Sequence, residues 1–196
     1  MLRDALAAID DEEVIELEKD LVRIPSYTIE EQELAHFIGD FLSDQGVEVE
    51  LQEVPFPRNK KSPNQFSYNV IGRIPGSDDG PSLMFNGHMD HNPIAGRDAM
   101  DFSDWKRDPW TPTIEDGYLY GKGCQDEKGG ICAFLSAARA IKKAGIRPRG
   151  DIVFAPVCGH KTHSAGTKAL LESGIRTDMA INSENSGNGI VALHVG

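Results

Sequence analysis

Apolar residues recur with helical spacing in two stretches near the amino terminus. The first begins after Asp10 or Asp11, either of which can cap a helix, and Pro25 stops it. The second runs from about Glu30 to Gln45, and Gly46 supplies the left-handed residue that closes it. We therefore expect two amphipathic helices, each packing one face on a core. Their apolar stripes are Val14, Leu17 and Leu21 in the first, and Leu34, Phe37, Ile38, Phe41 and Leu42 in the second.

Strands are predicted where apolar and polar residues alternate, or where a short apolar run stands between turn residues. Val47, Val49 and Leu51 alternate with acidic and amide side chains, so this strand is expected to have one face exposed to solvent. Thr113 to Tyr120 is typical of a short hairpin. Further strands are expected at 68–74, 82–86, 151–156 and 179–182, and helices at 129–144 and 166–172. This alternation predicts an α/β fold with a mixed, mainly parallel sheet covered by helices on both faces.

Two segments show neither the helical spacing nor the strand alternation of apolar residues. The first, from Pro55 to Gln65, is rich in Pro, Lys and Asn and is predicted to be a loop. The second, from 91 to 112, carries Trp105 and Trp110. Loops of that length inside a compact domain tend to be functional, and this one directly follows His88.

The length, net charge and cysteine content of the chain exclude several classes of protein. A chain of 196 residues suits one domain, or one large and one small domain. A net charge of -11 argues against nucleic acid and anionic membranes as partners. The three cysteines have no CxxC spacing, so neither a disulfide framework nor a zinc knuckle is indicated. Because no stretch resembles a signal peptide or reaches membrane-spanning length, we expect a cytoplasmic protein.

Polar residues follow three of the expected strands at their carboxyl ends. These are His88, with Asp90 close by, His160 and Glu184, and Asp126 joins them from the loop before a helix. Neighbouring parallel strands end along one edge of a sheet, so these groups can converge. Converging His, Asp and Glu side chains make a site for zinc or a similar divalent ion. The alternative is that each is an ordinary polar group on the surface.

Three motifs carry a resemblance to a known family. GHMDHNP, DWKRDPWTPTIEDGYLYGKGCQDEKGG and NSENSG resemble the dinuclear zinc peptidase and deacylase family that includes acetylornithine deacetylase, succinyl-diaminopimelate desuccinylase and glutamate carboxypeptidase. The resemblance covers essentially the whole chain and implies the catalytic fold of a zinc exopeptidase. It implies that His88 binds one metal, that Asp90 orients this histidine, that Asp126 bridges two metals, and that Glu184 binds the first. Zn²⁺ is the implied cofactor, with Co²⁺ or Mn²⁺ possible, as one or two ions.

The loop after the strand at 151–156 departs from the family pattern. Where the family has two consecutive glutamates, a general base and a ligand of the second metal, this chain has His160 and Lys161. Histidine can do base chemistry near neutral pH, so His160 is expected to replace the base. An ammonium group cannot bind a metal and opposes one, so we expect one ion to bind more readily than two. His163 is a possible replacement ligand, with a capping or surface role as the alternative.

The second departure is length. In the family the chain continues into a smaller domain, used for dimerisation and substrate closure, and then returns with a final histidine ligand. Residues 1–196 are therefore expected to be the N-terminal portion of a catalytic domain without that lid, either as a fragment or as a reduced form. A homodimer is expected only if the full protein has a lid domain.

The resemblance implies a metal-dependent hydrolase of an amide or peptide bond, with metal-activated water as the nucleophile. The implied substrate is a small N-acyl amino acid or a short peptide. One alternative is a non-catalytic or regulatory relative that binds metal, which the missing glutamate pair favours. Another alternative pairs Cys158 with His160 as nucleophile and base.

Overall fold

The computed structural model describes residues 2–56, 64–94 and 106–185, and at its centre is a five-stranded sheet. The strands, in order across the sheet, are β2 (Glu48–Pro55), β3 (Phe66–Ile74), β8 (Ile152–Val157), β4 (Leu83–His88) and β9 (Met179–Asn182). The helices are α1 (Leu2–Ala7), α2 (Asp11–Arg23), α3 (Gln32–Asp44), α4 (Gly129–Lys143) and α5 (Ala165–Glu172). Trp105, most of the predicted 55–65 loop and the end of the NSENSG motif lie outside the described residues.

The sheet is mixed, as the sequence predicts. β4 runs parallel to β8 on one side and to β9 on the other. β3 is antiparallel to both β2 and β8, so the sheet has a parallel half and an antiparallel half. The parallel half contains the three strands that precede His88, His160 and Glu184. Their carboxyl ends therefore share one edge of the sheet.

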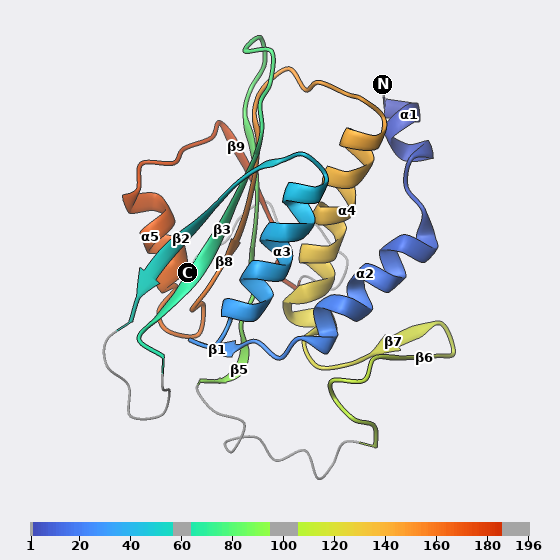
Figure 1. Cartoon of the computed structure of the whole chain (residues 1–196), viewed down its shortest axis with the longest axis vertical. Coiled ribbons are helices and arrows are strands. Elements are labelled where there is room, and N and C mark those ends of the chain that lie inside the picture. The colour runs from blue at the N-terminus through green and yellow to red at the C-terminus, as the bar shows by residue number, and fades with distance from the viewer. Residues whose placement is uncertain (1, 57–63, 95–105, 186–196) are drawn as a thin grey trace.

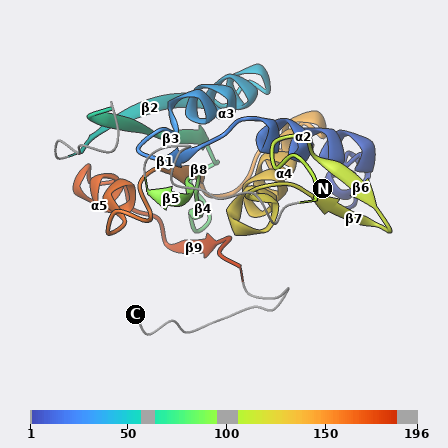
Figure 2. The ribbon, with the colours of Figure 1, turned by 90° about the horizontal axis from the view of Figure 1, so that it is seen from below.

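Helices cover both faces of the sheet, which confirms the predicted layering. α3 and α4 lie on one face and α5 lies on the other (Figures 1 and 2). Alternate residues of β8 divide between the two faces, as the pleat requires. Phe154 belongs to the larger core on the side of α2, α3 and α4. Val153, Ala155 and Val157 pack with Leu170 of α5 in a smaller core.

The ends of the first two long helices follow the sequence signals. The carboxylate of Asp10 caps α2 by accepting hydrogen bonds from the amides of Glu12 at 2.9 Å and Glu13 at 3.1 Å. Gly46, just after α3, has a φ of 72°, which glycine adopts without strain. No helix in the described part of the chain is long and apolar enough to cross a membrane.

Two small sheets flank the main one. The hairpin of β6 (Thr113–Glu115) and β7 (Tyr118–Tyr120) is the one predicted. In contrast, β1 (Tyr27–Thr28) pairs in parallel with β5 (His91–Ile94), and neither strand was expected. Both are too short to show an alternating pattern. α1 was also missed, because none of its residues is buried and it therefore shows no apolar stripe.

Candidate metal centre

Three predicted site residues meet at the carboxyl edge of the parallel strands. His88 ends β4, while Glu184 lies just past β9 and His160 just past β8. The pairing of β4 with both neighbours brings these ends level with one another. One ligand atom from each of the three side chains lies within 4.8 Å of the other two. The convergence predicted from strand order is therefore confirmed.

His88 is buried, and one hydrogen bond fixes its tautomer. Nδ1 lies 2.7 Å from the carbonyl oxygen of Asp90, which can only accept, so Nδ1 carries the proton. Nε2 faces three carboxylates, with Asp126 Oδ1 at 2.9 Å, Glu127 Oε2 at 3.3 Å and Glu184 Oε2 at 3.6 Å. Both His88 Nε2 and Asp126 Oδ1 are buried atoms without a hydrogen-bond partner in the described structure.

This arrangement fits a cation. Three carboxylates gathered around one imidazole nitrogen concentrate negative charge, which a bound cation or a protonated imidazole neutralises. One imidazole and two carboxylates are a donor set that suits Zn²⁺, Co²⁺ or Mn²⁺. His88 Nε2 with Asp126 Oδ1 and Glu184 Oε2 is one such set, and the ligand atoms that lie within 4.8 Å of one another are those of His88, His160 and Glu184.

Asp126 reaches the cluster from an irregular turn, η2 (Cys124–Lys128), that leads into α4. The turn is fixed by Lys128, whose buried Nζ donates to the carbonyl oxygens of Leu21 at 2.8 Å and Ile24 at 2.6 Å. Both carbonyls lie at the carboxyl end of α2, where the carbonyl oxygen of Leu21 also accepts a long hydrogen bond of 3.4 Å from the amide of Ile24, the C-cap residue. The α2 terminus and the Asp126 turn therefore stabilise each other.

Asp90 is fully buried and holds several segments together. Its carboxylate accepts hydrogen bonds from the Thr28 hydroxyl at 2.8 Å and from the amides of His160 at 2.9 Å and Lys161 at 3.0 Å. His88 Nδ1 is bound by the carbonyl of Asp90, while the nearest carboxylate oxygen lies 3.7 Å away. The backbone of Asp90 thus orients His88, and its side chain positions the loop that carries His160.

The same loop is held by two further buried acceptors. Asn69 Oδ1 accepts from the amide of Cys158 at 3.1 Å, and Glu31 Oε1 accepts from the amide of Gly159 at 2.9 Å. Burial, and secondly the charge of Asp90, raises the pKa of Glu31 to about 7. Four consecutive amides of this loop therefore have side-chain acceptors, which leaves it little freedom to move.

His160 lies against His88 with the two rings nearly parallel. Their centroids are 4.3 Å apart and their planes differ by 6°. Burial lowers the pKa of His160, and the neighbouring His88 and Lys161 act in the same direction. A lowered pKa favours the neutral imidazole, which is the form that accepts a proton.

Glu127 was not identified from the sequence, although it belongs to the site. It is buried, its Oε2 accepts a hydrogen bond from the amide of His88 at 3.0 Å, and its Oε1 accepts one from the hydroxyl of Ser183. Burial raises the pKa of Glu127. The sequence shows only that Glu127 directly follows Asp126. The side chains of neighbouring residues in a loop have no fixed relative direction, so this position did not predict that Glu127 points into the site.

Two other candidates lie apart from the cluster. His163 is exposed, has a φ of 59°, and is not among the side chains that meet at His88. Cys158 is fully buried, its Sγ lies 3.5 Å from Asn69 Oδ1, and burial raises the pKa of its thiol. A nucleophilic cysteine needs an accessible, easily ionised thiol, so the structure contradicts the Cys158 mechanism.

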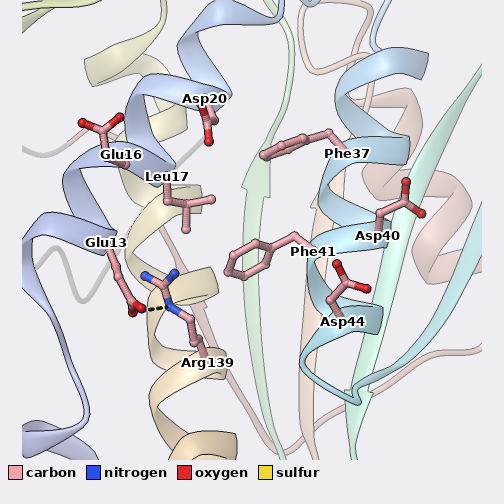
Figure 3. Close-up of a pocket in the computed structure, with 9 residues that line it drawn as sticks. All are labelled: Glu13, Glu16, Leu17, Asp20, Phe37, Asp40, Phe41, Asp44 and Arg139. Atoms are coloured by element: carbon pink, nitrogen blue, oxygen red, sulfur yellow. Dashed lines mark ion pairs between the residues drawn. The ribbon is translucent and has the colours of Figure 1, made fainter.

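We consider two surface pockets in the described part of the chain. A groove of about 380 Å³ lies between α2 and α3 (Figure 3), and Glu13 pairs with Arg139 inside it. None of its lining residues belongs to the cluster around His88. A second pocket of about 520 Å³ includes Cys124 and Gln125, which directly precede Asp126. Its other lining residues are Lys106, Arg107, Asp108, Leu119, Tyr120 and Gly121.

Known proteins resemble this chain in sequence and in fold. The model of peptidase family M20/M25/M40 matches residues 84–196. N-formyl-4-amino-5-aminomethyl-2-methylpyrimidine deformylase of Bacillus subtilis is 31% identical over 180 residues, which are 89% of this chain and 39% of that protein.

Two solved structures share the fold. Human carnosine dipeptidase 1 superposes with a TM-score of 0.75 at 22% identity, over 89% of this chain and 38% of that one. A dinuclear metal-binding peptidase of the M20 family from Bacillus subtilis superposes with a TM-score of 0.60 at 20% identity, over 90% of this chain and 43% of that one. The chain thus spans about two fifths of the length of these proteins.

Proposed function

This chain belongs to peptidase family M20/M25/M40, and from that premise we propose that the protein is a metal-dependent hydrolase of amide or peptide bonds. The proposed substrates are small N-acyl amino acids or short peptides. The observation that carries the proposal is the meeting of His88, His160 and Glu184, whose ligand atoms lie within 4.8 Å of one another, with Asp126 Oδ1 2.9 Å from His88 Nε2. A deformylase and a dipeptidase among the similar proteins support the substrate class.

In the proposed mechanism, His88, Asp126 and Glu184 would hold a Zn²⁺, Co²⁺ or Mn²⁺ ion. Such an ion, when bound, supplies Lewis acidity that polarises the scissile carbonyl and lowers the pKa of water. His160 accepts the proton of the attacking water and passes it to the leaving amine. Asp90 keeps His160 in place through its amide, 2.9 Å from the carboxylate.

The pocket that includes Cys124 and Gln125 is the proposed place for the substrate. Its volume of about 520 Å³ is within the range of small-molecule sites. Arg107 lies over the ring of Tyr120, with 4.5 Å between the guanidinium carbon and the ring centroid. Its guanidinium also forms an ion pair with Glu115, so a substrate carboxylate would have to replace Glu115 to bind there.

We also propose that residues 1–196 form the N-terminal portion of the catalytic domain. β9 is at the edge of the described sheet, and its apolar residues Met179 and Ile181 are 48% and 51% exposed. Exposed apolar residues on an edge strand are expected where further chain packs. A lid domain, and with it a homodimer, belongs to the rest of the polypeptide in this proposal.

A metal-binding relative without turnover is the second candidate. The specific observation in its favour is the loop after β8, which offers His160 and Lys161 and no carboxylate. Metal binding by the intact protein is expected under both candidates. Turnover separates them.

The test is hydrolysis by the intact protein after removal of metal with a chelator. The substrates are N-formyl, N-acetyl and N-succinyl amino acids together with dipeptides, each with added Zn²⁺, Co²⁺ or Mn²⁺. We expect no turnover without metal and turnover of at least one substrate class after metal is restored. Metal binding without turnover of any of these substrates would reject the enzyme and favour the second candidate.

Replacement of His160 tests its assigned role. His160→Asn should lower kcat by about 100-fold or more, because general base catalysis contributes roughly 10²–10⁴-fold. The affinity for the ion, measured by calorimetric titration with Co²⁺, should stay within a few fold of wild type. If metal affinity is lost together with turnover, His160 is a ligand and the assignment as base is wrong.

A further inference from the structure

The two carboxylate oxygens of Asp126 face two different side chains. Oδ1 lies 2.9 Å from His88 Nε2, at the position that fits a divalent ion. Oδ2 lies 3.6 Å from Nζ of Lys161. One oxygen is thus directed to the metal position and the other to a side-chain ammonium.

Lys161 is held where it can keep this contact. Its amide donates to Asp90 Oδ2 at 3.0 Å, within the loop whose successive amides are bound by buried acceptors. Its side chain is only 19% exposed, whereas that of Asp126 is 46% exposed. The partly buried Lys122 is also close enough for the charges of Asp126 and Lys161 to act on it.

The place beside Asp126 Oδ2 does not fit a second metal ion. The side chain beside this oxygen is that of Lys161, which has three donors and no lone pair when charged. His163, the one replacement ligand that the sequence suggests, is exposed and outside the cluster. A dication next to the ammonium would also be repelled by it.

We propose that Lys161 takes the place of a second metal ion, so that its ammonium neutralises the outer oxygen of Asp126 and the site binds a single divalent cation. This proposal rests on the proposed function for the first ion. It makes the protein a mononuclear counterpart of the dinuclear peptidase to which its fold is similar. In this proposal the carboxylate of Asp126 lies between one metal ion and the ammonium of Lys161, where a dinuclear site would have a carboxylate between two metal ions.

The test is the number of Co²⁺ ions bound by the intact protein, measured by calorimetric titration and by visible absorption. Wild type should bind one equivalent. Lys161→Glu should bind two, because a carboxylate replaces the ammonium and adds a ligand for the second ion. Lys161→Arg keeps the charge and should bind one.

Lys168→Glu is the matched control, because it makes the same change of charge on an exposed residue of α5. It should bind one equivalent, like wild type. Two equivalents in wild type, one in a folded Lys161→Glu variant, or a second ion in Lys168→Glu would each overturn the proposal. If Lys161→Glu does not fold, wild type and Lys161→Arg still test the proposal, because the binding of two ions by either protein would reject it. If wild type binds no ion at all, the proposed function itself fails.

Discussion

Glu127 joins three segments of the site through one carboxylate. It follows Asp126 in the turn before α4, binds the amide of His88 at the end of β4, and binds the hydroxyl of Ser183 next to Glu184. Each of these segments carries one proposed metal ligand. A single buried side chain therefore sets the distances among the three ligands, although it does not itself have to bind the ion.

We expect Glu127→Gln to weaken metal binding by about 10 to 100-fold, as for other residues that orient ligands. Glutamine keeps one acceptor oxygen, so either the amide of His88 or the hydroxyl of Ser183 loses its partner. The dissociation constant for Co²⁺, measured in the intact protein, is the readout. Glu172→Gln, an exposed carboxylate in α5, is the control for charge and should bind like wild type. Equal affinities in all three proteins would contradict the positioning role.

At the scale of elements, the first turn of α4 packs directly on the segment after β9. A Cβ atom added to Gly130 would lie 2.4 Å from Cβ of Ser183, closer than any normal contact. Only glycine permits this approach of helix and strand. The approach brings the Asp126 turn, which precedes α4, next to Glu184, which follows β9.

Gly130→Ala should therefore lower the free energy of unfolding by roughly 1–3 kcal/mol, the usual cost of overpacking. Gly39→Ala, inside α3, is the matched control, because its Cβ would lie 3.4 Å from the nearest atom, on Leu51. This second variant should be neutral or gain up to about 1 kcal/mol from helix propensity. Urea denaturation of the intact protein measures both. A Gly130→Ala variant as stable as Gly39→Ala would show that the helix can move away.

For the whole molecule, the buried acceptors under the loop after β8 make stability depend on pH. An unfolded glutamate ionises near pH 4.5, whereas burial raises the pKa of Glu31 to about 7 in the folded protein. Between these values the folded state binds more protons than the unfolded state. The contribution of Glu31 to stability is therefore complete below about pH 4.5 and is lost as the pH rises through about 7.

Glu31→Gln should remove this part of the pH dependence, which amounts to roughly 3 kcal/mol. Glutamine keeps an oxygen for the amide of Gly159 and has no charge to bury beside Asp90. The free energy of unfolding, measured from pH 4.5 to 8, should fall less steeply than in wild type. Glu33→Gln, an exposed residue in the first turn of α3, which Glu31 precedes as the N-cap, should leave the wild-type slope unchanged. Parallel curves for wild type and Glu31→Gln would reject the shift.

The sequence by itself determined the α/β class, the main helices and strands, and the convergence of His88, His160 and Glu184. These depend on local patterns, because periodicity marks an element and the order of parallel strands places their ends on one edge. The sequence did not show β1, β5 or the roles of Glu31 and Glu127. Their partners lie far along the chain, as when Glu31 binds the amide of Gly159. No local pattern records such a contact.

Tertiary structure also decided how the predicted residues act together. The sequence places Lys161 and Asp126 in separate loops, and only packing puts Nζ of one 3.6 Å from Oδ2 of the other. It likewise placed Asp90 beside His88, but the structure directs the backbone carbonyl to His88 and the carboxylate to the loop after β8. The reason is physical: residue type and spacing decide which groups reach the sheet edge, while the direction of each lone pair and charge depends on the burial and hydrogen bonds that packing creates.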